Sequence, residues 1–291
     1  MRAAEAVSHG AVTIVNAMAT GKGAAIGIDL WTKAKVTLTD KPGKIVCRNF
    51  TETNDDHLMR VTVTKVLRKF KLLKRHGAIV ETQSNIPVAV GLKSSSAASN
   101  AVTRATLEAI GEELDDYQTV RLGVDASLDA GVTITGAFDD ACACYFGGVM
   151  VTNNLTRQVL KRFKPPRGFS VLLYVPTTKK YTKDVNLSRL TKIKPLIETA
   201  FQETLNGNHW FALTLNGFTY AEAFGYNTDP IKDALFSGAI ASGLTGKGPA
   251  IVAIVHESNF RQVQKVWSCL SGKIIRTSFN LEKATSVKVD Q

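Results

Sequence analysis

The sequence predicts an α+β fold made of two lobes, and three observations lead to this expectation. The chain has 291 residues, which is enough for one or two domains with large cores. Segments of strand and helix character are mixed but do not alternate regularly, as a doubly wound parallel sheet would require. A polar stretch with two prolines at residues 161–168 separates two structured halves. We therefore expect one lobe at residues 1–160 and a second at residues 161–291.

Strands are expected where β-branched residues are concentrated between turn signals. These segments lie at residues 11–14, 31–38, 45–47, 78–83, 147–151, 171–175, 251–256 and 273–278. Two turns are also expected, a glycine-rich one at residues 21–27 and a Pro-Gly turn at residues 41–44.

Helices are expected where apolar residues recur at helical spacing before a stop signal such as Gly77, Gly111 or Gly131. These segments lie at residues 61–76, 97–110, 117–130, 193–205, 209–224, 230–239 and 260–270. Asp115 or Asp116 is expected to open the third of these helices, because a carboxylate caps free amides well.

Composition is typical of a soluble globular protein, with 44% hydrophobic and 21% charged residues. No apolar run reaches 18 residues, so we expect no membrane partner. The segment from Met1 to Glu5 carries an early acid and does not resemble a signal peptide, so we expect a cytoplasmic protein.

Cysteines and histidines give no sign of a metal centre. Cys142 and Cys144 are two apart, which matches neither redox nor zinc spacing, and the four cysteines are expected to be small buried apolar residues. The five histidines are scattered singly along the chain.

The formal net charge is +11, which favours anionic ligands such as nucleotide phosphates or an acidic metabolite. The densest basic run lies at residues 65–75 and is interleaved with apolar residues at helical spacing, so we expect a helix with a solvated basic face. Most of the charge is spread along the chain, and no aromatic residues are convincingly interleaved with a basic stripe. We therefore expect no nucleic-acid partner.

The segment at residues 87–98, PVAVGLKSSSAA, has the character of a phosphate-binding loop. It follows a predicted strand and opens a predicted helix, where free amides and the helix dipole favour an anion. Serine hydroxyls can cap the helix or bind Mg²⁺, and Lys93 adds a cation beside them. An ordinary serine-capped helix would need fewer of these features.

Two other phosphate motifs are excluded by their spacing. A Walker A loop ending at Gly246-Lys247 would need glycine at Ala241 and a hydroxyl residue at Gly248. The dinucleotide fingerprint starting at Gly21 would need glycine where Ile26 stands.

The serine-rich segment resembles the second motif of the GHMP kinases, P-x-x-x-G-L-G-S-S-A-A, and its G-L-K-S-S-S-A variant is similar to the archaeal shikimate kinases. Lys93 stands where glycine is usual, and one extra serine is present. The resemblance implies ATP bound by Pro87, Gly91, Leu92, Lys93, Ser94, Ser95, Ser96 and Ala97. It also implies Mg²⁺ at one of the three serines, with Ser96 as our first choice.

The segment at residues 135–148, TGAFDDACACYFGG, holds two adjacent acids among small apolar residues. Phosphoryl transfer to an alcohol uses a carboxylate to orient or deprotonate the hydroxyl, although an acidic turn or helix cap would look similar. The segment resembles the family pattern P-S-G-x-D-N-A before a glycine pair. This resemblance makes Asp139 the candidate catalytic base and places Asp140 where asparagine is usual. Family members also carry a metal-binding acid on the preceding helix, which implies Asp129 or, second, Asp125.

The glycine-rich segment at residues 241–250 resembles the third family motif, so Gly246 and Lys247 are candidate ATP contacts, with a flexible hairpin as the alternative. The first motif is poorly matched at residues 10–25, where the usual G-E-H triplet is absent. Asn16, Lys22 and Asp140 are the candidate substrate contacts, together with the segment at residues 177–181.

The resemblance implies a lobe similar to the second domain of ribosomal protein S5 followed by a ferredoxin-like lobe. It implies a monomer or homodimer that uses ATP and Mg²⁺ to phosphorylate the 3-hydroxyl of shikimate in aromatic amino-acid biosynthesis. A homoserine or mevalonate kinase is the alternative within the family. A basic RNA-binding protein with the S5-like fold is the alternative from another class.

Overall fold

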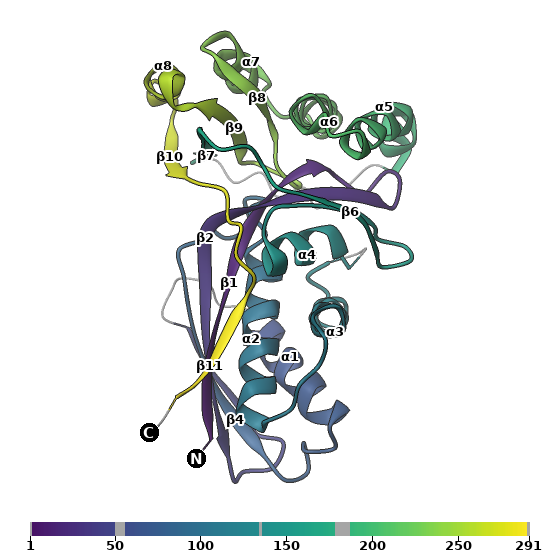
Figure 1. Cartoon of the computed structure of the whole chain (residues 1–291), viewed down its shortest axis with the longest axis vertical. Helices are drawn as coiled ribbons and strands as arrows, with labels where there is room; N and C mark the ends of the chain where they lie inside the picture. The colour runs from purple at the N-terminus through teal and green to yellow at the C-terminus, as the bar shows by residue number, and fades with distance from the viewer. Residues whose placement is uncertain (1, 50–55, 134–135, 178–186, 290–291) are drawn as a thin grey trace.

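The computed structural model describes residues 2–49, 56–133, 136–177 and 187–289. Its described strands form two sheets, one of seven strands and one of four. Figure 1 shows the smaller sheet and helices α5 to α8 stacked above the larger sheet and helices α1 to α4. The expected two-lobed α+β architecture is therefore confirmed.

The larger sheet is built on a long antiparallel pair, β1 (Ala3–Val15) and β2 (Lys22–Thr39). One half of β2 pairs with β4 (Gly77–Ser84), and the other half pairs with β5 (Val149–Asn153). Register shifts between β1 and β2 interrupt this pair, and such irregularities bend and twist a strand. The pair thereby runs from the base of the first lobe to the underside of the second lobe (Figure 1).

The remaining strands of this sheet lie at its margins. Strand β3 (Ile45–Asn49) pairs in parallel with β4, and β6 (Gln158–Phe163) pairs with β5. The last strand, β11 (Thr285–Val289), pairs with β1, so Val289 lies opposite Ala3. The end of the chain therefore returns to the first sheet, and β6 runs across residue 160. The division at residues 160 and 161 stays a prediction.

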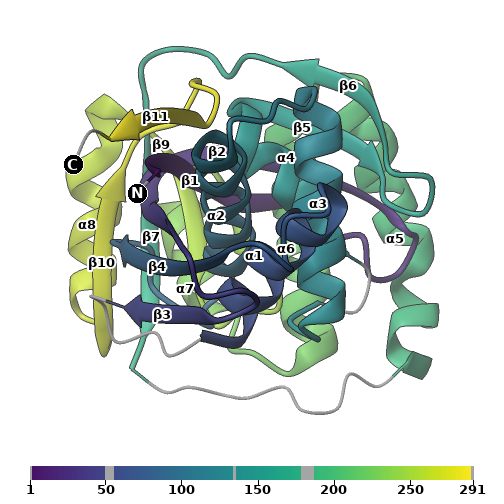
Figure 2. The same cartoon turned by 90° about the horizontal axis from the view of Figure 1, so that it is seen from below.

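Helices cover one face of this sheet. They are α1 (Asp56–Lys69), α2 (Ser94–Ile110), α3 (Asp116–Asp129) and α4 (Phe138–Phe146). Figure 2 shows α1, α2 and α3 on the same side of β1 and β4. Ala97, Ala101 and Ala105 of α2 are fully buried. Their small side chains let this helix lie close to the strands behind the serine-rich segment.

The second lobe has a ferredoxin-like order of strands. Its sheet runs β10 (Gly272–Thr277), β7 (Phe169–Pro176), β9 (Ile251–His256), β8 (Ala239–Leu244), and all neighbours are antiparallel. Between β7 and β8 the chain forms α5 (Leu187–Leu205), α6 (His209–Phe224) and α7 (Asp229–Phe236). A short 3₁₀ turn (Glu257–Asn259) and α8 (Phe260–Ser268) connect β9 to β10. This is the split βαβ arrangement expected from the resemblance.

Several local expectations were wrong. Helix α1 begins earlier and ends at Lys69 rather than His76, because the chain turns at Lys71 with a left-handed φ of 59°. The glycine-rich turn ends near Gly21, and the residues after it belong to β2, where they pair with β1 and β5. Cross-strand pairing overrides the preference of glycine for turns at these positions.

The burial of the cysteines follows the expectation only in part. Cys142 and Cys144 are buried, but Cys47 is half buried and Cys269 is exposed, and all four are free.

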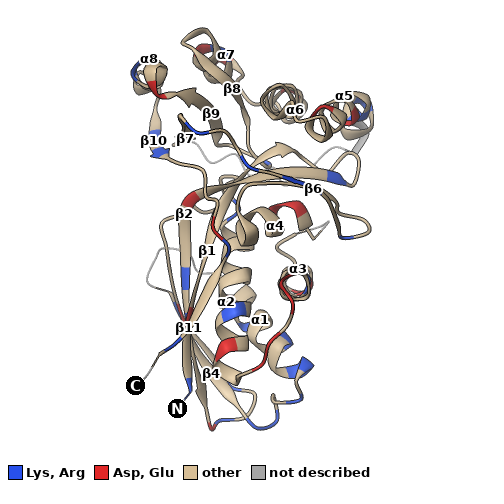
Figure 3. Ribbon diagram, viewed as in Figure 1, with Lys and Arg blue, Asp and Glu red and all other residues tan. Residues whose placement is uncertain are grey.

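Figure 3 shows Lys and Arg spread over both lobes rather than gathered in one stripe. Within the described residues, no helix is both long and apolar enough to cross a membrane.

Helix α6 approaches β8 through two facing glycines. A Cβ added to Gly217 would lie 2.3 Å from the Cα of Gly243. We expect Gly217→Ala to lower the free energy of unfolding by about 1–3 kcal/mol, because the backbone of β8 must shift. Chemical denaturation measures this change.

Gly123→Ala in α3 is the matched control, because its Cβ would meet side chains rather than backbone, and the nearest of these atoms is the hydroxyl of Ser99 at 3.0 Å. Helix propensity alone favours alanine over glycine by about 1 kcal/mol. A Gly217→Ala protein more stable than the wild type would contradict this account of the α6–β8 contact.

Candidate active site

The serine-rich segment begins with a tight loop, in which three residues before α2 adopt a positive φ. Ala89, Gly91 and Lys93 all have positive φ, of 59°, 91° and 64°. The side chain of Thr245 donates to the Gly91 carbonyl at 3.0 Å, and the Ala250 amide donates to the Val90 carbonyl at 3.1 Å. The loop is therefore held against the glycine-rich segment of the second lobe.

Glycine is required where these two loops meet. A Cβ on Gly91 would lie 2.1 Å from the carbonyl oxygen of Thr245. A Cβ on Gly246 would lie 3.1 Å from the Cα of Gly91 and 3.0 Å from Nζ of Lys93. The structure thus brings these two glycines into direct contact with each other.

Helix α2 begins with free amides. The first helical hydrogen bond at its start runs from the Ala97 amide to the Lys93 carbonyl, and Lys93 makes no side-chain cap. Within the described residues, neither the amides nor the hydroxyls of Ser94, Ser95 and Ser96 have a hydrogen-bond partner. The alternative of a serine-capped helix therefore loses its basis. Free amides at the positive end of a helix dipole form an anion site.

The glycine-rich loop after β8 is anchored on β1. The Gly246 amide donates to Oγ1 of Thr13 at 3.0 Å, and the Thr13 amide donates to Oγ1 of Thr245 at 3.0 Å. Nδ2 of Asn16 donates to the Gly246 carbonyl at 3.0 Å. Asn16 thus supports the loop, and its contact with a substrate stays a prediction. Lys247 is exposed, and its carbonyl accepts from the Tyr226 hydroxyl.

Asp139 lies in the first turn of α4 and is only 4% exposed. Nδ2 of Asn154 donates to its Oδ1 at 2.7 Å, and the Asp139 amide donates back to Oδ1 of Asn154 at 3.2 Å. The hydroxyl of Thr152 donates to the same Asn154 oxygen at 2.6 Å. A Cβ on Gly23 would lie 2.2 Å from Oδ2 of Asp139, so only glycine fits on the facing strand β2.

Burial changes the chemistry of this carboxylate. Loss of hydration, and next the charge of Asp140, raise the pKa of Asp139 to about 7, against the opposing effects of Asn154 and Lys93. A carboxylate that exchanges its proton near neutral pH is suited to act as a general base. The acidic-turn interpretation predicts an exposed carboxylate instead.

Two of the departures from the family pattern, Lys93 and Asp140, meet in space. Nζ of Lys93 lies 3.1 Å from Oδ2 of Asp140, and the two side chains are only 9% and 14% exposed. Oδ1 of Asp140 is buried and has no hydrogen-bond partner. This ion pair joins the beginning of α2 to the beginning of α4, so it places the candidate anion site beside the candidate base.

Lys22 lies at the start of β2, next to Gly23. Its ammonium is 3.3 Å from Oε2 of Glu198 and 5.7 Å from the ring centroid of Phe201, both on α5. The side chain is 36% exposed, so it is available to an anionic ligand. Of the segment at residues 177–181, only Thr177 is described, and residues 178–181 lie outside the described part of the chain.

The carboxylates predicted as metal ligands are each paired with a basic side chain. Asp129 is paired with Lys65 of α1, and Asp125 accepts from Arg157 at 2.6 Å. Over residues 2–49, 56–133, 136–177 and 187–289, no group of three or more His, Cys, Asp and Glu side chains could hold a metal ion. Mg²⁺ in kinases is bound largely by phosphate oxygens with one or two protein ligands, and the free Ser96 hydroxyl fits that role. The metal assignment stays a prediction.

Sequence reasoning missed several residues that build the site. These residues are Asn154, Thr152, Gly23 and Thr13. None belongs to a recognisable motif, and their partners lie up to 233 residues away in the sequence. The short helix α4 was also missed, because its nine residues are too few to show a helical period.

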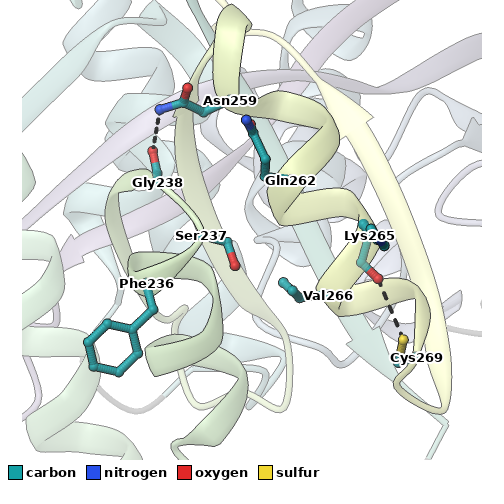
Figure 4. A pocket seen from close by; sticks show the side chains of 8 residues that line it. All are labelled: Phe236, Ser237, Gly238, Asn259, Gln262, Lys265, Val266 and Cys269. Atoms are coloured by element: carbon teal, nitrogen blue, oxygen red, sulfur yellow. Dashed lines mark hydrogen bonds between the residues drawn. The ribbon is translucent and has the colours of Figure 1, made fainter.

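A separate groove lies between α7 and α8 in the second lobe (Figure 4). Its lining includes Phe236, Asn259, Lys265 and Cys269 but no carboxylate. A groove without an acid lacks a base for phosphoryl transfer, so it is not the candidate active site.

Known proteins match nearly the whole chain. The family model of the GHMP kinases N terminal domain matches residues 57–148. A shikimate kinase of Methanothrix thermoacetophila is 43% identical, with 98% of this chain and 96% of that protein covered. A shikimate kinase of Pyrococcus abyssi is 44% identical, with 92% and 96% covered. The chain belongs to the archaeal shikimate kinases of the GHMP kinase family. It is therefore a kinase.

Solved structures of other GHMP kinases share the fold. The Methanococcus jannaschii mevalonate kinase has a TM-score of 0.75 at 15% identity, and covers 95% of this chain and 98% of its own. The Lactococcus lactis galactokinase, complexed with galactose, has a TM-score of 0.77 at 13% identity, with 97% and 95% covered. At these identities the similarity shows the fold alone. The GHMP kinase fold predicted from the motifs is thus confirmed.

The raised pKa of Asp139 predicts a dependence of stability on pH. The folded-state pKa lies above the unfolded value, so the cost of ionising the buried group appears as pH rises from about 4 to about 7. Asp139→Asn removes this cost and keeps an acceptor for Asn154. We expect the variant to gain Tm over the wild type progressively across this interval, as measured by thermal unfolding at several pH values.

Asp229→Asn is the control, because Asp229 is 66% exposed on α7. It should show no comparable trend. A Tm difference for Asp139→Asn that stays constant from pH 4 to pH 8 would mean that the carboxylate has an ordinary pKa.

Proposed function

We propose that this kinase transfers the γ-phosphoryl group of ATP to the 3-hydroxyl of shikimate, giving shikimate 3-phosphate and ADP in aromatic amino-acid biosynthesis. The observation that carries the proposal is the junction of α2 and α4. A buried carboxylate with a pKa near neutrality lies one residue from Asp140, which is paired with Lys93 at the start of α2. A base and an anion site are thereby brought together.

ATP is assigned to the serine-rich loop and the glycine-rich loop. The free amides of Ser94, Ser95 and Ser96 lie at the positive end of the α2 dipole, and Lys93 adds a cation. Pro87, Gly91, Leu92 and Ala97 shape the same loop, and Gly246 and Lys247 close it from the second lobe. Ser96 and Asp129 are the proposed ligands of Mg²⁺, which neutralises phosphate charge when bound.

Asp139 is the proposed general base. Its carboxylate would orient the acceptor hydroxyl and take its proton as the new phosphate ester forms. Asn154 fixes the orientation of the carboxyl group, which keeps one oxygen directed at Gly23 on the neighbouring strand. The buried surroundings strengthen these electrostatic effects because little water is present to screen them.

The choice of shikimate rests on the relatives and on the charge of the site. The relatives at 38–44% identity are named shikimate kinase. Shikimate carries a carboxylate, which needs a cation as its partner. Lys22 is the proposed cation, because it is partly exposed and lies beside Gly23. Asn16 and Asp140 are further candidate contacts for its hydroxyl groups. Mevalonate and homoserine are the alternative acceptors, because kinases for them share the fold.

We further propose a cytoplasmic monomer or homodimer without a nucleic-acid or membrane partner. The spread of the basic residues supports this proposal, since a nucleic-acid surface concentrates them (Figure 3).

ADP release over a panel of shikimate, homoserine and mevalonate tests the acceptor. We expect turnover with shikimate only, because its ring carboxylate and hydroxyls match the proposed cation and polar groups. Omission of Mg²⁺ serves as the blank. Turnover with homoserine or mevalonate and none with shikimate would reject the proposed substrate while keeping the kinase.

The role of Asp139 is tested by Asp139→Asn. We expect kcat to fall by about 10²–10⁴-fold, because amide nitrogen cannot accept the proton of the hydroxyl. Asp40→Asn, in the exposed turn after β2, is the control and should retain full activity. Near-wild-type turnover by Asp139→Asn would remove this residue from the mechanism.

A further inference from the structure

The Lys93–Asp140 pair is unusual among the ion pairs of the described residues in being almost shielded from solvent. Its side chains are 9% and 14% exposed, and in each of the other pairs at least one partner is more than 30% exposed. Shielding from water makes such a pair sensitive to the loss of either member, because the remaining charge is left uncompensated.

The backbone holds Lys93 in an unfavourable conformation to make this pair. Lys93 has φ 64° and ψ 32°, a left-handed conformation that glycine adopts readily and residues with a side chain rarely adopt. Its ammonium passes close to Gly246, where an added Cβ would lie 3.0 Å from Nζ. Strained conformations of this kind persist only where the surrounding structure imposes them, and they cluster at functional sites.

The pair acts directly on the electrostatics of Asp139. On α4 itself, Asp140 and the buried thiol of Cys142 face this carboxylate, and burial raises the pKa of Cys142, so the thiol stays neutral. From the other elements, Lys93 and Tyr220 of α6 lie near it, and burial raises the pKa of Tyr220, so it is neutral too. Asp140 and Lys93 are therefore the charges that these neighbours bring to bear on Asp139.

We propose that Lys93 and Asp140 form a positioning pair for this reaction, in which Asp140 holds the Lys93 ammonium at the junction of the two loops and Lys93 cancels the Asp140 charge beside the base. The proposal rests on the proposed function for the role of Asp139. Asp140 acts through Lys93 and Asp139 rather than on the reacting atoms.

Removing either member of the pair should shift the pKa of the neighbouring carboxylate, in opposite directions for the two members. In Lys93→Met, the uncompensated charge of Asp140 should raise the pKa at which the Asp139–Asp140 dyad gains its first proton by about one unit. In Asp140→Asn, the uncompensated ammonium should lower the pKa of Asp139 by a similar amount. The double variant removes both charges and should return close to the wild type. Both single substitutions keep the approximate side-chain size, and circular dichroism checks that each variant folds.

Two measurements report this shift. The first follows the carboxyl ¹³C signal of Asp139 with pH in the full chain without substrate, using Asp139→Asn to assign the signal. The second follows the acid limb of the pH profile of kcat/KM, with whichever acceptor the ADP-release panel identifies. Because the base must be ionised, a higher pKa moves the acid limb to higher pH. Lys232→Met and Asp229→Asn remove an exposed pair on α7 and should change neither measurement.

Opposite shifts in the single variants, with recovery in the double variant, support the positioning pair. Shifts in the same direction, no shift beyond the α7 controls, or no recovery in the double variant would overturn it. The NMR titration needs no acceptor, so a failed acceptor panel rejects the proposed substrate and still leaves the pair tested. An opposite pair of NMR shifts without movement of the acid limb would overturn the role of the pair in the reaction.

Discussion

The burial of Asp139 is the constraint on which the candidate site depends. A carboxylate placed at 4% exposure must be compensated, and this chain compensates it with Asn154, with the start of α4 and with Lys93. The compensation is incomplete, so its pKa remains near neutrality. The same feature costs stability at neutral pH and, in the proposed mechanism, supplies the general base, which is the usual conflict between stability and activity at an enzyme site.

The second lobe contributes to the site through backbone contacts. Gly91 and Gly246 let the loops of the two lobes approach within van der Waals distance, and Thr245 bonds across the junction to the Gly91 carbonyl. Thr13 and Asn16 tie the glycine-rich loop to β1. Contacts from the second lobe therefore help to fix the geometry of the serine-rich loop of the first lobe.

Some elements were predictable because their signals are local. Helix α2 and its serine-rich start follow from small residues before a helical period, and Asp115 caps α3 as expected, accepting from the Gln118 amide. Strand β11 was not predicted, because five residues with three exposed positions give little pattern, and its pairing partner lies at the opposite end of the chain. The exposed Cys269 also departed from expectation, since exposure depends on the packing of α8 rather than on residue type.

The sequence by itself determined the family, the two-lobed α+β fold and the identity of the two chemical segments, because motif order and residue type are written along the chain. Only the tertiary structure decided that Lys93 and Asp140 pair with each other and that Asn154 and Gly23 enclose Asp139. These contacts join residues 15 to 116 positions apart, and each depends on how the helices and strands pack. A linear pattern records which residues are present. Their pKa values and the distances between their side chains are decided only when packing removes water and brings these residues together.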